Sequence, residues 1–430
     1  MSDIFIVDDQ HPEDNAMLQA LYSRSPQSVL LQLEKVKKAG SGKFMDQFYI
    51  GYGHKSIGDC GSTTLFIEGG SMLAAKAVQD SPLYNGQEAS TRYINMSEQP
   101  MVDPVGTEAS KAIQDRWMAF YNKAMPTMTE HLAENVFPRK EGEDEKAHKK
   151  AIKARAFDVM RGFLPAGCAT FVSWHTNLRQ AGEHLDKLRH SPCSEIRQLG
   201  EAIESELVAK YPNSFSAKRY PETEEYLRNV EAEALFNPDT HPIEVECTST
   251  IKARDLDLAI VALRPEKARL PHYLDELGQV TYKFLMDFGS FRDLQRHRNG
   301  VCRMPLVSTR WGFNEWYLEQ LPDSLRHEAE MLVQAQTTAI DLLLAPLVEK
   351  QHLVAMGFNV PCQVTRGLPG TLYLIDLRTT KVVHPTMRKV AQDMATSLQA
   401  LYPVPNLIKY ADMEPGTWDL KRGKQDIEAK

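Results

Sequence analysis

At 430 residues the chain is longer than one hydrophobic core usually serves, so its length predicts about two domains. Its 42% apolar and 25% charged residues are typical of a soluble globular protein, and no apolar run approaches the roughly 18 residues of a membrane span. The formal net charge of −7 argues against a general nucleic-acid binder, but not against a small anion held by a few local arginines.

The start of the chain and its cysteines point to the cytoplasm. Met1–Gln10 is acidic and no apolar segment follows it, so no secretory signal is expected. The six cysteines are scattered without a C-x-x-C pair, which favours reduced thiols over a disulfide frame or a zinc knuckle.

The first half of the chain reads as helices around a short strand-like run. Asn15–Ala39 has a helical pattern, interrupted at Ser25-Pro26, and Thr63–Ile67 is β-like. The later stretches are expected to form an amphipathic helix, a charged connector and three more helices: Glu108–Leu132, Arg139–Lys150, Ala151–Gly162, Gln180–Arg189 and Cys193–Tyr211.

The second half repeats several of these landmarks in the same order. Tyr211–Pro242 has little periodicity and is the expected linker, and Asp255–Leu263 and Tyr273–Met286 resume apolar patterns. The repeated landmarks are Asp323–Gln351 with Glu108–Leu132, Asn359-Val360-Pro361 with Phe163-Leu164-Pro165, Leu377-Arg378 with Leu188-Arg189, and Phe291–Trp311 with Leu65–Tyr93.

This order predicts an internal duplication near residue 240. We expect an α+β fold made of two tandem copies of one unit, each an antiparallel sheet with helices. The first copy would span 1–215, a linker 216–250, and a more diverged second copy 251–430.

Three groups of polar residues are candidates for ligand binding. Arg92 with Ser90 and Glu88 could cradle a phosphate and a sugar, although an exposed turn with a capping serine has the same composition. Arg296-His297-Arg298 offers two fixed cations around an imidazole, and the alternative is a solvated basic corner.

The third group is Arg161, Asn177, Arg179 and Arg189, which could line a shared cleft or simply lie on helix surfaces. His175, His184 and His190 lack metal-ligand spacing with a carboxylate, so no metal is expected. No serine or cysteine stands in a recognisable nucleophile context.

As an ordered set, these residues resemble the flavin-dependent thymidylate synthase (ThyX) family. That family runs Gly-His-x-Ser/Thr-x-x-Glu-His, Arg-His-Arg, Asn-Glu-x-Ser-x-Arg-Tyr, Arg-x-x-Leu-Pro, Asn-x-Arg, and Leu-Arg before Glu-Ile-Arg. The corresponding segments here are Gly53–Cys60, Gln87–Tyr93, Arg161–Pro165, Asn177–Arg179, Leu188-Arg189 and Glu195–Arg197.

The two halves depart from the family pattern in complementary ways. The first half has Asp80-Ser81-Pro82 where the family has Arg-His-Arg, and Asp59 and Cys60 replace Glu and His. The second half keeps Arg296–Arg298 but lacks the Gly-His and Asn-x-Arg elements. Since family members are homotetramers with sites shared between subunits, the resemblance implies a homodimer in which the two halves complete each other's sites.

The resemblance implies transfer of a one-carbon unit to C5 of a deoxyuridine monophosphate-type nucleotide. FAD would be the cofactor, with methylenetetrahydrofolate and NADPH as co-substrates. Glu88, Ser90, Arg92, Arg161 and Arg189 would bind the nucleotide, and Arg189 would also polarise the pyrimidine. FAD would be held by His54, Ser56, Asp59, Asn177, Arg179, Arg296, His297 and Arg298.

Two alternatives stay open at this point. One is a flavin-dependent enzyme that modifies a different nucleotide or base. The other is a non-catalytic nucleotide-binding or assembly protein that has lost flavin. In every case the expected partners are small molecules rather than nucleic acid or membrane.

Overall fold

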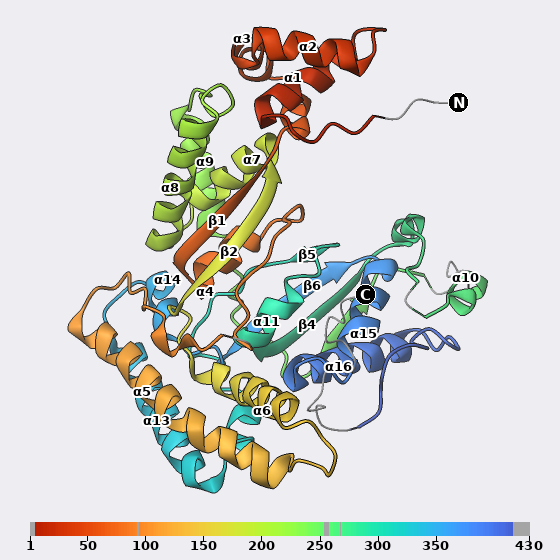
Figure 1. Cartoon of the computed structure of the whole chain (residues 1–430). Coiled ribbons are helices and arrows are strands. Elements are labelled where there is room, and N and C mark those ends of the chain that lie inside the picture. Colours follow the sequence, from red (N-terminus) through yellow and green to blue (C-terminus); the bar gives the residue numbers. More distant parts are fainter. Residues whose placement is uncertain (1–4, 93, 253–257, 267, 416–430) are drawn as a thin grey trace. The chain divides into compact units, whose positions relative to one another are not determined.

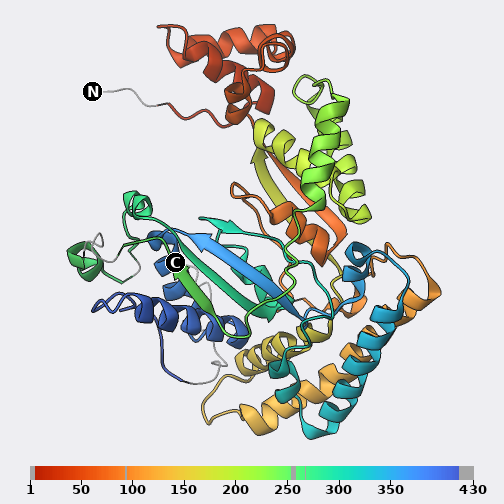
Figure 2. The same cartoon turned by 180° about the vertical axis from the view of Figure 1, so that it is seen from behind.

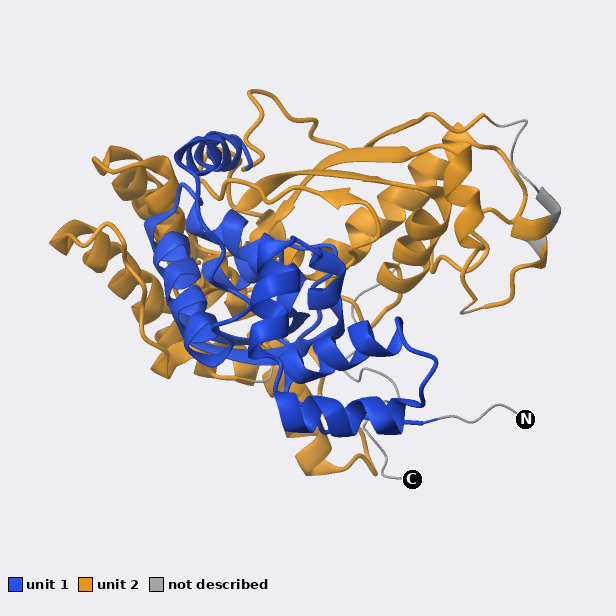
Figure 3. Ribbon diagram, turned by 90° about the horizontal axis from the view of Figure 1, so that it is seen from above, with its two compact units in different colours: residues 1–70, 74–88, 170–234 blue, residues 71–73, 89–169, 235–430 orange. Residues whose placement is uncertain are grey.

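The computed structural model describes residues 5–92, 94–252, 258–266 and 268–415. The chain forms two compact units (Figure 3). Unit 1 comprises residues 1–70, 74–88 and 170–234, and unit 2 comprises residues 71–73, 89–169 and 235–430. Unit 2 therefore contains residues from both predicted copies, whereas unit 1 comes almost entirely from the first. The predicted boundaries follow sequence halves and stay a prediction.

Unit 1 is built on a two-stranded sheet of β1 (Ser62–Ser71) and β2 (Ala169–Asn177). In β2 the buried Val172 and Trp174 alternate with the exposed Phe171 and His175, as in a half-buried strand. The helices of unit 1 are α1 (Pro12–Tyr22), α2 (Val29–Ala39), α3 (Gly42–Phe44), α7 (Leu178–Arg189), α8 (Ser194–Lys210) and α9 (Pro221–Ala232). Most of α4 (Met72–Gln79) also belongs to unit 1, whereas its first two residues belong to unit 2.

Unit 2 contains a four-stranded sheet in which β4 and β6 are the central strands. Its order is β3 (Glu246–Ser249), β4 (Val280–Asp287), β6 (Asn359–Arg366), β5 (Val301–Cys302), and each neighbouring pair is antiparallel. The helices α11 (Phe288–Leu294), α15 (Leu368–Arg378) and α16 (Pro385–Leu401) follow these strands and contribute to one large core (Figure 1).

Two long helices, α5 (Glu108–His131) and α13 (Asp323–Leu342), lie side by side in unit 2 (Figures 1 and 2). A capping box between Thr107 and Ser110 satisfies backbone N–H groups at the start of α5. The remaining helices of unit 2 are α6 (Glu145–Met160), α10 (Leu258–Leu263), α12 (Glu315–Glu319) and α14 (Leu347–Lys350). Short helical turns are η1 (Met45–Gly51), η2 (Lys55–Cys60), η3 (Met96–Glu98), η4 (Leu132–Val136), η5 (Arg161–Phe163), η7 (His272–Leu277) and η8 (Gln351–Leu353).

One succession of elements occurs twice along the chain. It runs from a strand and short helix (β1–α4, then β4–α11) through a long helix (α5, then α13) to a short turn (η5, then η8). A strand and two helices follow (β2–α7–α8, then β6–α15–α16). The mixed α+β architecture with antiparallel sheets is thus confirmed.

Backbone hydrogen bonds in unit 2 repeat with the same succession, about a bridge between Pro165 and Ala355. Four of the bonds made by one segment have a counterpart at the equivalent position of the other. The bond from Ala166 N to Val354 O is matched by the bond from Met356 N to Leu164 O, and Gly167 N to His352 O is matched by Gly357 N to Gly162 O. In the same way, Met72 N to Cys168 O is matched by Phe288 N to Phe358 O, and Val102 N to Gly167 O by Asn314 N to Gly357 O.

Two segments predicted as connectors contain helices. Within Arg139–Lys150, α6 already begins at Glu145, because the side chain of Asp144 accepts a hydrogen bond from Ala147 N and caps it. Within the predicted linker 216–250, Pro221 opens α9 and glutamates fill its first turn, which are helix-start signals that the low periodicity concealed.

Two other expectations differ in detail. The predicted helix Asp323–Gln351 breaks before Pro346, since proline cannot continue the ladder, and α14 follows. The bridge pairs Pro165 with Ala355, so the counterpart of Leu164-Pro165 is Val354-Ala355 and not Val360-Pro361. Asp255–Leu263 lies partly outside the described residues, and its described part is α10.

Among the described residues, no helix combines the length and the apolar character that crossing a membrane requires.

Candidate functional site

Arg161 is a buried cation at the junction of α6 and η5, held by side chains from the second half of the chain. Its Nη2 donates to Ser290 Oγ at 2.9 Å and its Nε points to Tyr317 Oη at 3.4 Å. The neighbouring Gly162 allows this, because a Cβ there would lie 2.5 Å from the Tyr317 ring. Among the described residues no acceptor occupies Nη1, so this edge of the guanidinium is left for a ligand.

A buried carboxylate stabilises this arrangement from behind. Asp287 Oδ2 accepts hydrogen bonds from Tyr317 Oη and from Ser290 N, both at 2.8 Å. Burial and the neighbouring Asp287 hold the pKa of Tyr317 well above its usual value, so the phenol stays protonated and donates. Burial alone would lower the pKa of Arg161, but Tyr317 and nearby carboxylates outweigh it and raise that pKa, so the guanidinium stays charged.

Arg92 reaches the same region from the turn that follows Ser90. Its Nε lies 2.5 Å from Asp158 Oδ1, and Arg155 Nη1 lies 3.0 Å from Asp158 Oδ2. The Ser90 hydroxyl accepts from Arg92 N at 3.3 Å and thereby shapes the turn. Tyr93 of the same motif lies outside the described residues.

Asp293, near the end of α11, is the acidic centre of the cluster. Burial alone would raise its pKa, but Arg92, Arg378, Arg296 and Arg161 outweigh that effect and hold the pKa well below its usual range. Arg92 and Arg161 come from the first half of the chain, Arg296 and Arg378 from the second. Groups that the sequence separates by hundreds of residues therefore share one electrostatic environment within unit 2.

Arg378, at the end of α15, is fixed as firmly as Arg161. Its Nη2 donates to the main-chain oxygen of Asp293 at 2.9 Å, and its Nε donates to His297 Nε2 at 2.8 Å. Burial, Arg378 and Arg366 hold the pKa of His297 well below its usual value, so the ring is neutral and can accept. His297, predicted to face a flavin, is therefore turned toward Arg378.

The cluster carries an excess of positive charge. The linked charged groups are five arginines (Arg92, Arg155, Arg161, Arg296 and Arg378) and three aspartates (Asp158, Asp287 and Asp293). Arg298 and Arg366, which act on His297, add further positive charge, so cations outnumber carboxylates in this part of unit 2. Cations held this close in a buried site are stable only with anionic partners, so a phosphate is the natural complement.

Other predicted nucleotide ligands are engaged within unit 1. Glu88 and Lys76 form a buried ion pair at 2.7 Å, with side chains 2% and 0% exposed. Arg189 is paired with Asp186 at 2.6 Å and lies near Glu224 and Glu204, at 3.6 and 3.7 Å. Neither residue is among the groups that act on Asp293.

The predicted flavin ligands of the first half also lie in unit 1. Arg179 pairs with Asp59 at 2.7 Å, while His54 and Ser56 are exposed beside them. The Asn177 side chain caps α7 by accepting from Gln180 N at 2.8 Å. Of the second-half candidates, Arg296 and His297 join the Asp293 cluster, and Arg298 flanks His297.

Unit 1 contains a cavity of about 290 Å³ that includes two of these residues. Arg179 and Arg189 line it together with Lys55, Tyr49 and Tyr220. Its walls mix cations with carboxylates such as Glu183 and Glu204, so charge on the protein side is nearly balanced.

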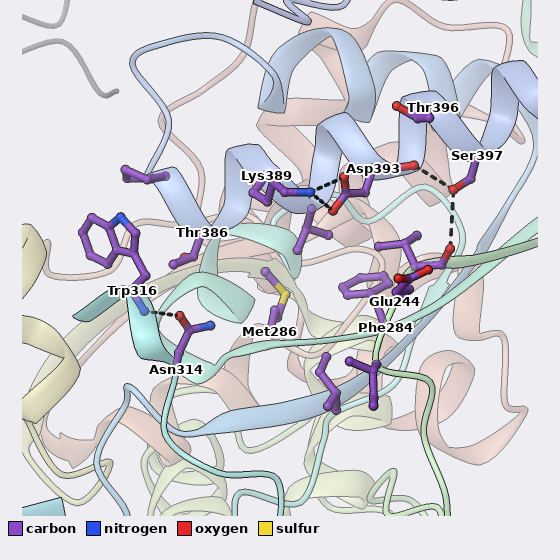
Figure 4. A pocket seen from close by; sticks show the side chains of 15 residues that line it. Glu244, Phe284, Met286, Asn314, Trp316, Thr386, Lys389, Asp393, Thr396 and Ser397 are labelled. Atoms are coloured by element: carbon purple, nitrogen blue, oxygen red, sulfur yellow. Dashed lines mark hydrogen bonds and ion pairs between the residues drawn. The ribbon is translucent and has the colours of Figure 1, made fainter. Parts of the chain in front are cut away.

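Unit 2 contains a larger cavity of about 600 Å³ (Figure 4). Its apolar wall is Phe284, Met286 and Trp316, and its polar groups already bond one another: Lys389 with Asp393, and Ser397 with Val245 O. The cavity also touches the network around Arg161, because Thr386 lines it and lies 2.7 Å from Ser290 Oγ.

Sequence reasoning missed Asp158, Asp287, Asp293 and Tyr317. Their local contacts, such as the capping of α11 by Asp287, do not reveal the site, because each of them also acts on a residue far away along the chain. Arg378 had a signal: its Leu-Arg pair repeats Leu188-Arg189, and that parallel identifies it.

Comparison with known proteins is consistent with the predicted resemblance. Residues 6–213 match the model of the thymidylate synthase complementing protein family. A UPF0159 protein of Chlamydia muridarum is 24% identical over 88% of this chain and 82% of its own length. UPF0159 proteins of Chlamydia pneumoniae and Thermoplasma acidophilum are each 22% identical, over 91% and 97% of this chain and 85% and 98% of their own lengths.

Proposed function

We propose, from the premise that residues 6–213 belong to the thymidylate synthase complementing protein family, that the Asp293 cluster binds a pyrimidine nucleoside monophosphate. The observation that carries the proposal is the excess positive charge, gathered from both halves of the chain around Asp293 and Arg161. Arg161 and Arg92, with Ser90, would hold the phosphate through charge-assisted hydrogen bonds.

The reaction we propose is one-carbon transfer to C5 of a deoxyuridine monophosphate. Arg378 takes the role that the resemblance implied for Arg189, because it is the guanidinium fixed beside Asp293 and Arg296. A fixed cation at the carbonyl edge of the pyrimidine would stabilise negative charge on the carbonyl oxygen, which is the enolate-like form of the ring in which C5 is nucleophilic. Since Arg378 is already held by two acceptors, it needs no reorganisation during the reaction.

The cavity of unit 1 has cationic and aromatic groups that part of a flavin dinucleotide could contact, although carboxylates nearly balance its charge. Lys55 and Arg179 could meet a diphosphate, and Tyr49 and Tyr220 offer aromatic faces. Its volume of about 290 Å³ is at the lower limit for a small-molecule site, so the remainder of FAD would need groups from elsewhere, which a homodimer would supply. When bound, the reduced flavin would supply the hydride, and NADPH and methylenetetrahydrofolate would be the co-substrates.

We further propose that the chain arose by duplication and keeps one nucleotide site per chain. The repeated hydrogen bonds about Pro165 and Ala355 support duplication. They make Gln351 the counterpart of Arg161, and its amide is already used by Val307 N and Val348 O. The Leu-Arg motif of Arg378 repeats Leu188-Arg189, and the charge of Arg189 is met by three carboxylates.

Calorimetric titration with dUMP tests the proposal. The wild type should bind about one dUMP per chain, and Arg161→Gln, which introduces the side chain of the equivalent position, should weaken binding by about tenfold or more. Arg388→Gln is the matched control, because Arg388 is also a buried arginine of unit 2 but donates to Thr379 O. A wild type that binds no dUMP, or an Arg161→Gln variant that binds like the control, contradicts the proposal.

One observation favours a second candidate, a nucleotide-binding protein without flavin. Asn177 is committed to capping α7 and Asp59 to pairing with Arg179, so two predicted flavin ligands already have protein partners. The absorbance of the purified protein with added FAD separates the two candidates, since bound flavin is coloured near about 450 nm. Tight dUMP binding without flavin uptake would support the second candidate.

A further inference from the structure

The carboxylate of Asp293 is an acceptor with no donor of its own. Its side chain is 17% exposed, and its nearest ion-pair partner, Arg296 Nη1, lies 3.7 Å from Oδ1, beyond hydrogen-bond distance. Among the described residues, no N–H or O–H donates to either carboxylate oxygen. The four arginines keep the group ionised, so at neutral pH it can only accept.

Such a carboxylate divides the proposed nucleotide site into two regions. Phosphate oxygens and a carboxylate repel each other, so the phosphate must lie on the side of Arg161 and Arg92. The part of the ligand that meets Asp293 must carry an N–H or O–H donor. The nucleobase supplies such donors, and an ionised acceptor bonds them strongly.

The flanking residues specify the pattern of that base edge. Arg378 is anchored to the Asp293 main chain and to His297, and among the described residues no acceptor meets its Nη1. Arg296 Nη1 lies 3.7 Å from Asp293 Oδ1, and its side chain is half exposed. Two donors, Arg378 and Arg296, therefore lie near the carboxylate acceptor of Asp293.

Uracil has the complementary edge, with acceptors O2 and O4 on either side of the N3–H donor. Cytosine has an acceptor at N3 and an amino donor at C4, so its N3 would face the carboxylate without a proton. A site built to bond a particular N–H strongly rejects analogues that lack it, because its buried polar groups are then left unpaired.

We propose that Asp293 is the specificity-determining residue that selects uracil over cytosine nucleotides by accepting a hydrogen bond from N3–H. This inference rests on the proposed nucleotide site and names the group that reads its base. The family pattern predicts the phosphate-binding arginines, but it does not assign a role to Asp293.

Titration of the wild-type protein with three ligands tests the inference directly. dUMP should bind about tenfold or more tightly than dCMP, and tighter by a similar factor than 3-methyl-dUMP, which keeps both carbonyls but lacks the N3 proton. Equal binding of dUMP and 3-methyl-dUMP would overturn the assignment without any mutation. If neither dUMP nor inorganic phosphate binds, the nucleotide site itself fails, and this inference fails with it.

A variant then assigns the effect to the residue. Asp293→Asn offers an amide that can accept or donate, so the preference for dUMP over dCMP should fall close to one, while inorganic phosphate should bind at least as tightly. Asp376→Asn is the control, because Asp376 is another carboxylate of unit 2 in an arginine-rich setting, but it is paired with the buried Arg264. If Asp293→Asn keeps the full preference for dUMP, Asp293 does not read the base.

Discussion

Replacing Tyr317 with phenylalanine removes one hydroxyl from the support of Arg161. The Tyr317 side chain is fully buried, so the ring can keep its packing while Asp287 Oδ2 loses a donor at 2.8 Å and Arg161 Nε loses its contact at 3.4 Å. Removing a hydrogen bond to a buried charged group typically costs about 1.5–3 kcal/mol. We therefore expect Tyr317→Phe to lower the free energy of unfolding by about 2 kcal/mol.

The same variant should weaken dUMP binding by several-fold, because Arg161 is then held by Ser290 alone and is less well oriented. Urea unfolding followed by circular dichroism gives the first quantity and calorimetry the second. Tyr402→Phe is the control: it removes an equally buried hydroxyl, bonded to Ile251 O at 2.7 Å, and should cost about 1 kcal/mol without affecting dUMP. The reasoning is refuted if Tyr317→Phe binds dUMP as tightly as Tyr402→Phe does.

Two further predictions concern unit 1. Burial lowers the pKa of His184 to about 4, so its neutral form stabilises the fold above the ordinary pKa near 6.5, and this stability is lost as pH falls from there toward 4. Between pH 7.5 and 5.5 the free energy of unfolding, measured with urea, should fall by roughly 1 kcal/mol more in the wild type than in His184→Asn. Equal falls would show that His184 is not the cause. The control variant His175→Asn, which changes an exposed histidine, should behave like the wild type. Glu88→Gln should cost about 3–5 kcal/mol because it leaves Lys76 buried beside a neutral group, whereas the double change Lys76→Met with Glu88→Leu should recover most of that stability. A double variant no more stable than Glu88→Gln would show that the ion pair is not the cause.

Much of the fold was predictable from local patterns. Amphipathic periodicity and stop signals located α5, α7 and α8, since burying one face of a helix requires apolar residues at its own spacing. Short-range motifs also predicted the resemblance to the family whose model matches residues 6–213, and they marked Ser90, Arg92 and Arg161 as candidates. Connectors were harder, because the helix α9 depends on its start signals more than on an apolar stripe.

The sequence by itself determined which cations this chain possesses and which family model its first half matches. Only the tertiary structure decided which of them meet: Arg161 finds Ser290 and Tyr317, and Arg378 stands beside Asp293. Such contacts join residues far apart along the chain, and their geometry is set by how whole elements pack, to which no local pattern of residues responds. The same packing gave Arg189 three carboxylate partners, although its motif resembles that of Arg378.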